Sequence, residues 1–392
     1  MGSNPQSLLI RNVRVVLPER SVDTADVFIE QGRIARISER GGQSQGSDCA
    51  AIDLSGASLF PGFIDVHIHG AMGVDTMAAD ENDLKSVSQF LASEGVTGWL
   101  PTLVPASTAD YRGAVKAIAG AMTSATGARI LGVHYEGPFV NSHQCGALRS
   151  QFFRSFSTAT ELDDLPLLGE AARHMITVAP EIDGGIELVR VLHARGWIVS
   201  IGHTRASLEL LDESFAAGAH HMTHFMNAMP PLHHRSPGPV GWGLSNDEVT
   251  CDMIADGVHL DREMLRLLLK LKSAGRLLLI SDAVAAAGMG DGDYEIWGET
   301  ITVKDGRTAN ARGAIAGSVI SMLDAVRLML SLGVTETDVA MMAAGNPAKL
   351  LGIDDECGSI AEGKRADLVA LDANGNVALT IVGGEIFKGS EK

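Results

Sequence analysis

The sequence predicts an α/β protein built on a (β/α)8 barrel of the TIM type, with a small β-sandwich-like domain formed from the two chain ends. Short apolar runs alternate with amphipathic helical stretches through residues 61–352, a pattern typical of a parallel sheet. That segment is long enough for a barrel, which needs about 250 residues. Both chain ends show the alternation of strands instead. We therefore expect a barrel over residues 61–352 and a β domain over residues 1–60 and 353–392.

The N-terminal strands are expected in residues 8–58, as LLIRNVRVV, DVFIEQGRIARIS and AIDLSGASLF. Their alternating and β-branched residues favour an antiparallel meander, interrupted by a polar, glycine-rich stretch at Gly41–Ser47. The C-terminal segment ADLVALDANGNVALTIVGGEIFKG alternates in the same way, with an Asn-Gly turn at Asn374–Gly375. Chain termini commonly lie close together, so the two ends can pair into one domain.

The central region alternates strands and helices. Apolar runs such as RILGVHYEGPF, GWIVSIGHT and RLLLISDA are separated by helical patterns such as SLELLDESFAAG and SMLDAVRLMLSLG, several of which end in glycine. A doubly wound open sheet is the structural alternative. It ranks second because no glycine-rich phosphate-binding fingerprint follows the first strand.

Composition limits the classes of function. The net charge of −17 over 392 residues argues against a nucleic-acid partner, because phosphate backbones require a basic surface. No apolar run is long enough to cross a bilayer, and MGSNPQSLLI lacks the features of a signal peptide, so no membrane association is expected. The four cysteines are scattered without paired spacing, which favours the reducing cytoplasm.

Polar side chains recur where apolar strands end. In a (β/α)8 barrel the carboxyl ends of the strands form the active-site face, so residues far apart in sequence converge there. The residues in this position are His67, His69, Glu136, His203, His224, His259 and Asp282.

His67 and His69 form an HxH pair on a strand. Because side chains alternate with a period of two, both imidazoles point to one face and can hold one cation. Two histidines with backbone partners are the alternative, but the other strand-end ligands favour metal binding. His134 shares a face with Glu136 and is expected to fill the barrel. The remaining histidines lack the strand-end position and are expected at the surface or in supporting roles: His143, His174, His193, His220, His221, His233 and His234.

Asp282 follows a strongly apolar strand in the sequence SDA. It could simply cap the next helix. Beside a metal centre, a carboxylate can take a proton from water and deliver it to a leaving group. Its place in the series of strand ends favours this catalytic role.

These motifs resemble a known family. The segments PGFIDVHIHG, GVHYEGPF, IGHT, THFMNAM, DGVHL, SDA and AGS, in this order, are similar to those of the N-acetylglucosamine-6-phosphate deacetylases of the amidohydrolase superfamily. The resemblance continues through GNPAKLLG into the C-terminal tail and so covers nearly the whole chain. It implies hydrolysis of an N-acetylated amino-sugar phosphate by a metal-bound hydroxide, and it implies a homodimer.

The resemblance also implies roles for individual residues. Glu136, His203 and His224 match the ligands of the main divalent metal, and His67 and His69 match a second metal site found in some members. The metal can be Zn, Fe, Mn or Co, with one or two ions per subunit. Asp282 matches the general base and acid, and His259 matches the residue that polarises the acetamide carbonyl. The residues that match the substrate-binding segments are Asn227, Ala228, Arg235, Ala147, Ile315, Ala316 and Gly317.

Leu148 departs from the family pattern. It occupies the place in Cys145-Gly146-Ala147-Leu148 where the family usually has a substrate-binding histidine. Leucine cannot donate a hydrogen bond, so either Arg149 or His143 substitutes or the substrate differs. A deacetylase of the galactosamine epimer, or another amidase of the superfamily, is therefore an alternative. A non-catalytic metal-binding scaffold is disfavoured because ligands, base and carbonyl-polarising histidine occur together.

Overall fold

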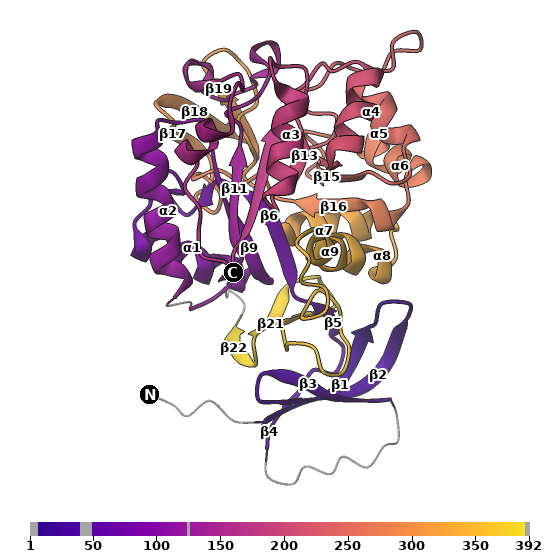
Figure 1. The fold of residues 1–392 in the computed structure, drawn as a ribbon. Coiled ribbons are helices and arrows are strands. Elements are labelled where there is room, and N and C mark those ends of the chain that lie inside the picture. Colours follow the sequence, from indigo (N-terminus) through magenta and orange to yellow (C-terminus); the bar gives the residue numbers. More distant parts are fainter. Residues whose placement is uncertain (1–6, 40–48, 124–125, 389–392) are drawn as a thin grey trace.

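The computed structural model describes residues 7–39, 49–123 and 126–388. It contains a barrel surrounded by helices and a separate sheet built from both ends of the chain (Figure 1). The predicted fold class is confirmed. The glycine-rich stretch Gly41–Ser47 lies outside the described residues.

Parallel strands form the barrel, and each is buried along most of its length. In spatial order they are β6 (Phe63–Ile68), β9 (Val96–Leu103), β11 (Gly132–Glu136), β12 (Arg173–Val178), β13 (Ile198–Ile201), β14 (Ala219–Met222), β15 (Thr250–Ile254) and β16 (Leu277–Ile280), with β10 (Arg129–Ile130) beside β9.

Hydrogen bonds between the first and last strands close the barrel. The Asp282 N–H donates to the His67 carbonyl at 2.9 Å, and the Ser281 hydroxyl donates to Asp65 at 2.5 Å. This closure matters for the site, because it places Asp282 beside the strand that carries His67 and His69.

Helices, short 3-10 turns and a π-helical turn at Met341–Gly345 cover the outside of the barrel. Their bounds are α1 (Glu81–Ser93), α2 (Thr108–Met122), α3 (Gly185–Ala194), α4 (Leu208–Ala217), α5 (Gly238–Ser245), α6 (Arg262–Leu271), α7 (Met322–Ser331), α8 (Glu336–Ala340), α9 (Asn346–Leu350), η1 (Ser142–Gln144), η2 (Ser150–Phe152), η3 (Ala159–Asp164), η4 (Ala274–Arg276) and η5 (Met341–Gly345). Capping boxes begin α1 at Asp80, α2 at Ser107 and α7 at Ser321, satisfying N–H groups that no helical partner reaches. No helix in the described part of the chain is both long and apolar enough to cross a membrane.

The sheet from the chain ends joins strands from both termini. Its strands are β1 (Ser7–Val16), β2 (Ser21–Glu30), β3 (Arg33–Glu39), β4 (Ala50–Asp53), β5 (Ser58–Pro61), β20 (Leu368–Leu371), β21 (Val377–Val382) and β22 (Glu385–Lys388). The predicted antiparallel meander is correct for β1, β2 and β3 but wrong for the third segment, because β4 and β5 run parallel to β1. They occupy the edge of β1 that β2 leaves open, which satisfies its backbone hydrogen-bonding groups.

Glu336, at the start of α8, ties the small sheet to the barrel. Its carboxylate accepts hydrogen bonds from Arg14 Nε at 2.8 Å, from the Ser21 hydroxyl at 2.9 Å and from the Ser58 hydroxyl at 3.0 Å. These donors lie on β1, β2 and β5.

Two small sheets are inserted near the carboxyl ends of the barrel strands. One pairs β7 (Gly70–Ala71) with β8 (Val74–Asp75), and the other consists of β17 (Gly292–Ile296), β18 (Glu299–Lys304) and β19 (Arg307–Asn310). The second sheet lies at the top of the molecule in Figure 1, at the opposite end from the sheet of the chain ends.

Candidate active site

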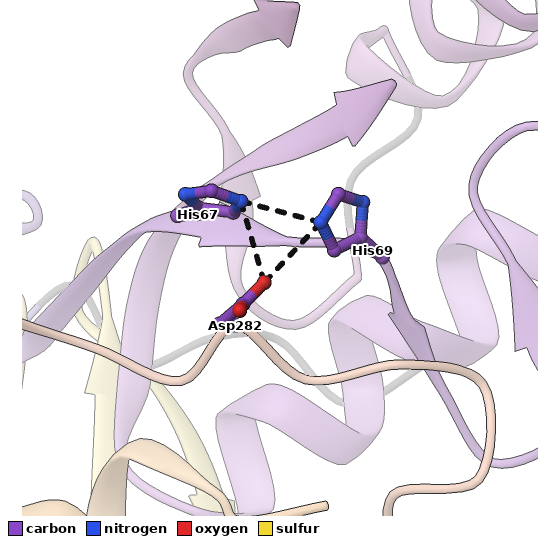
Figure 2. Close-up of side chains that lie close together, drawn as sticks. All are labelled: His67, His69 and Asp282. Atoms are coloured by element: carbon purple, nitrogen blue, oxygen red, sulfur yellow. Dashed lines mark hydrogen bonds and ion pairs between the residues drawn. The ribbon is translucent and has the colours of Figure 1, made fainter. Parts of the chain in front are cut away.

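His67, His69 and Asp282 form one buried group of candidate metal ligands (Figure 2). The two imidazole Nε2 atoms lie 3.2 Å apart. Asp282 Oδ1 is 3.3 Å from Nε2 of His67 and 3.2 Å from Nε2 of His69. Three ligand atoms thus converge on one point at the junction of β6 and β16.

Glu136, His203 and His224 form a second group. Glu136 Oε1 lies 3.0 Å from Nε2 of each histidine, and the two Nε2 atoms are 3.1 Å apart. The same carboxylate reaches the first group, with Oε2 3.2 Å from Nε2 of His69. Glu136 therefore joins the two groups into one centre.

The backbone at three of these residues adopts an uncommon conformation. His203, His224 and Asp282 have positive φ angles of 47°, 30° and 48°. Residues other than glycine rarely adopt this region, and such strain persists where the surrounding structure enforces it. It turns each side chain into the barrel just after its strand ends, so the sequence-predicted strand-end residues share one rim.

The far side of two imidazoles is held by backbone carbonyls. His203 Nδ1 donates to the Gln144 carbonyl at 2.7 Å, and His69 Nδ1 donates to the Thr102 carbonyl at 3.3 Å. A proton on Nδ1 leaves the lone pair of Nε2 directed into the centre, as metal-ligating histidines require. Imidazole nitrogens and carboxylate oxygens at these separations fit divalent cations such as zinc.

The charges of the centre without a cation follow from its geometry. Burial opposes protonation of His69, but hydrogen bonds to Asp282 and Glu136 outweigh it and raise its pKa to about 10. For His224, the Glu136 carboxylate likewise overcomes burial and raises the pKa to about 9. Burial alone would raise the pKa of Glu136, but the surrounding imidazoles hold it well below its usual value. Protons on the imidazoles therefore balance the carboxylates until cations replace them.

His134 belongs to neither group. Its ring is fully buried, with Nε2 2.8 Å from the Thr177 hydroxyl and Nδ1 3.5 Å from the Thr102 hydroxyl. Burial lowers its pKa well below the ordinary histidine value, so the ring is neutral. It packs edge-on against His67, with ring centroids 4.6 Å apart. This position agrees with the expectation that His134 fills the barrel.

Two buried acids support the ligands and were not identified from the sequence. Asp252 on β15 accepts from the His224 N–H and contacts His221 Nε2 at 3.0 Å. Asp65 on β6 accepts from the Ser281 hydroxyl at the barrel closure. The available signal was their occurrence inside otherwise apolar strands, where an unpaired carboxylate would be costly.

His259 is oriented by a residue that the sequence analysis also missed. Its Nδ1 lies 2.7 Å from Asp256 Oδ2, and its backbone N–H donates to the same carboxylate. Burial would raise the pKa of Asp256, but the contact with His259 keeps it lowered. The ionised Asp256 fixes the ring and leaves Nε2 of His259 available to a ligand.

The predicted substrate-binding residues fall into two sets. Among those near the centre, Asn227 has a buried side-chain Nδ2 without a hydrogen-bond partner in the described structure, and Ala228 lies at φ 52° on the same loop. Gly317 closes against Asp282, since a Cβ there would lie 2.8 Å from the Asp282 carbonyl oxygen. Ile315 and Ala316 directly precede Gly317.

The second set makes no contact with the ligands in the described structure. Arg235 is exposed farther along the same loop after β14, and its guanidinium contacts Nε2 of His234 at 2.9 Å. Ala147 is half-buried, and Leu148 is buried in an apolar cluster with Val104 and Val140. Leu148 therefore supplies no polar contact, because a leucine side chain has no hydrogen-bonding atom.

Comparisons with known proteins agree with this architecture. The amidohydrolase family model matches residues 58–387. The chain is 37% identical to an N-acetylglucosamine-6-phosphate deacetylase of Bacillus subtilis, covering 97% of each chain, and 35% identical to an N-acetylgalactosamine-6-phosphate deacetylase of Escherichia coli O157:H7, covering 96% and 98%. The crystal structure of N-acetylglucosamine-6-phosphate deacetylase from Pasteurella multocida is similar, with a TM-score of 0.90, 28% identity, and coverage of 98% of this chain and 100% of that chain. This protein belongs to the amidohydrolase family and groups within it with the N-acetylglucosamine-6-phosphate deacetylases.

Proposed function

We propose that this protein hydrolyses the N-acetyl group of N-acetylglucosamine 6-phosphate to give glucosamine 6-phosphate and acetate. One observation carries the proposal. Six buried side chains from five strand ends form a single centre of imidazoles and carboxylates, with Asp282 at its edge. Such a centre suits hydrolysis of an amide.

The roles of the residues follow from their positions. A divalent cation held by these groups would polarise the amide carbonyl and lower the pKa of a water molecule. His259, held by Asp256, presents Nε2 to the carbonyl oxygen as negative charge develops there. Asp282 accepts a proton from the attacking water and passes it to the amide nitrogen, which leaves as the free amine.

Asn227, Ala228 and the segment Ile315–Gly317 would contact the sugar, and Ala147 and Leu148 would border it. Arg235 would bind the phosphate, because a guanidinium pairs with phosphate oxygens in a bidentate manner. Arg235 is exposed on the loop after β14, so its guanidinium is accessible to a phosphate from solvent.

We propose two divalent cations per subunit. The support is the presence of two ligand groups joined by Glu136, whose two oxygens face different groups. Zinc, iron, manganese and cobalt all accept imidazole and carboxylate ligands, so the metal must be identified by elemental analysis.

The galactosamine epimer is the second candidate substrate. Leu148 favours it, because a leucine at this place removes a polar contact, and a relative of 35% identity is an N-acetylgalactosamine-6-phosphate deacetylase.

The deciding experiment measures acetate release from both epimers before chelation, after chelation, and after restoration with zinc, manganese or iron. Faster release from the glucosamine substrate, lost on chelation and restored by metal, is the expected result. Preference for the galactosamine substrate would favour the second candidate. No release by metal-loaded protein would contradict both.

We also propose a homodimer, a cytoplasmic location, and a division into a β domain of residues 1–60 and 353–392 and a barrel of residues 61–352. The membership of β1 to β5 and β20 to β22 in one sheet supports the division. The scattered spacing of the four cysteines supports the cytoplasmic location. Light scattering coupled to size-exclusion chromatography would establish the number of subunits.

A further inference from the structure

Trp297 occupies a backbone position that rarely accepts a large side chain. It forms, with Gly298, the two-residue turn between β17 and β18, and both residues have positive φ angles of 55° and 81°. Four other two-residue hairpin turns among the described residues have the same signs, and they use Gln31–Gly32, Met72–Gly73, Asp305–Gly306 and Gly383–Gly384. Turns of this kind favour asparagine, aspartate or glycine at the first position. A tryptophan there indicates a purpose other than turn formation.

The indole lies against the candidate metal centre. Its ring packs edge to face on His69, with centroids 5.0 Å apart and an interplanar angle of 79°. It also packs against the apolar cluster that contains Leu148. Trp297 and Leu148 also line one small cavity of 190 Å³, together with charged residues such as Arg149 and Glu299. The indole itself forms an apolar wall next to His69, where the amide of a substrate would be cleaved.

Internal hydrogen bonding does not account for this position. The indole N–H is buried and has no hydrogen-bond partner in the described structure, although a buried tryptophan usually finds one. Burial raises the pKa of Asp75 and the nearby indole N–H opposes that rise, but the two groups lack the geometry of a hydrogen bond. A tryptophan placed only for stability would satisfy its N–H and avoid a strained backbone.

We infer that Trp297 is a substrate-contacting residue that packs on the N-acyl group and limits its length. The inference rests on the proposed function and adds its acyl specificity. Because the indole covers His69, the space beside the reacting carbonyl is bounded by a rigid ring. An acetyl methyl fits beside such a wall, whereas each added methylene must displace the ring or the hairpin that carries it. One methylene in an apolar pocket changes selectivity by about 10- to 200-fold.

The test compares wild type with Trp297→Gly on the N-acetyl, N-propionyl and N-butyryl derivatives of glucosamine 6-phosphate. Release of the free amine is measured, and kcat and KM are determined for each. Glycine suits the turn and offsets part of the packing lost with the indole, so the variant is expected to fold with a Tm at or somewhat below that of the wild type. We expect the wild type to prefer acetyl over butyryl strongly, and Trp297→Gly to reduce that ratio of kcat/KM by at least tenfold.

Two further variants separate the effect of losing the indole ring from the effect of changing the turn. Asp305→Gly makes the same backbone change in the neighbouring hairpin and is expected to leave selectivity unchanged. Trp297→Phe keeps an aromatic ring and is expected to retain most of the preference for acetyl. If Trp297→Gly folds poorly, Trp297→Asn, which also suits the turn, takes its place.

An unchanged acetyl-to-butyryl ratio in a folded Trp297→Gly or Trp297→Asn variant, with an active wild type, would overturn this inference alone. A wild type that accepts all three acyl groups equally would do the same. Failure of the metal-loaded wild type to release amine from any of them would overturn the proposed function and this inference with it.

Discussion

Gly317→Ala tests whether the tight packing around Asp282 is required for activity. Gly317 has a φ of 57°, and an added Cβ would lie 2.8 Å from the Asp282 carbonyl oxygen and 2.6 Å from Val284 Cγ1. The Val284 methyl can move, but the carbonyl is backbone and also accepts from the Ser318 N–H at 2.7 Å. Something next to Asp282 must therefore shift.

The two costs can be separated. A left-handed backbone costs an alanine about 1–2 kcal/mol relative to glycine, and overpacking adds about 1–3 kcal/mol. A shift of about 1 Å in a reacting group costs about 100-fold in rate. We therefore expect Gly317→Ala to lose about 2–5 kcal/mol of unfolding free energy and about 100-fold in kcat/KM while retaining its metal.

Gly313→Ala is the matched control. Gly313 has a φ of 77°, and an added Cβ would meet no heavy atom within 4 Å. It therefore carries the backbone cost without the contact, and its kcat/KM should stay near wild type. Urea unfolding, metal analysis and steady-state kinetics on both variants give the comparison. A Gly317→Ala variant with wild-type kcat/KM would refute the requirement for close packing at Asp282.

Three other outcomes are expected. Asp282→Asn should keep the cation held by Glu136, His203 and His224 but lose about 10²–10⁴-fold in kcat, because an amide cannot accept the proton. Kinetics with metal analysis checks this, and near-normal turnover would remove Asp282 from its role. The pKa values of His69 and His224 without a cation are about 10 and about 9, so metal binding must displace their protons. The affinity for the metal should therefore rise by up to about tenfold per pH unit for each proton released below pH 9. Calorimetry in buffers of different ionisation enthalpy counts those protons, and a pH-independent affinity would contradict the prediction. Glu336→Ala should cost about 1–2 kcal/mol at neutral pH in urea unfolding. Burial would raise the pKa of Glu336, but hydrogen bonds, led by the one from Arg14, lower it below 4.5. The stabilisation by the Glu336 carboxylate is therefore present above pH 4.5 and disappears as the pH falls through the lowered pKa. An equal cost at pH 7 and at pH 3 would contradict this reasoning.

The sequence by itself determined the barrel and the rim of its site. Strand–helix alternation indicates a parallel barrel, and parallel strands present their carboxyl ends on one face. Position along each strand was therefore enough to predict that His67, Glu136 and His203 would meet. Neither inference requires knowledge of which strands are neighbours, because every strand of a closed barrel contributes to the same rim.

Contacts between distant segments were decided only by the tertiary structure. Closure of β16 against β6 puts Asp282 within 3.3 Å of both His67 and His69, and no local pattern encodes that neighbour. The same limit applies to the parallel pairing of β4 and β5, because alternation fixes which face a side chain occupies but not the direction of the partner strand.

The position of Trp297 over His69 depends on the path of an inserted hairpin. No pattern in the sequence singled out Trp297. The position of a residue along its strand specifies which face of the sheet it occupies and how near it lies to the strand end. Its partners depend on how the strands and insertions pack in three dimensions.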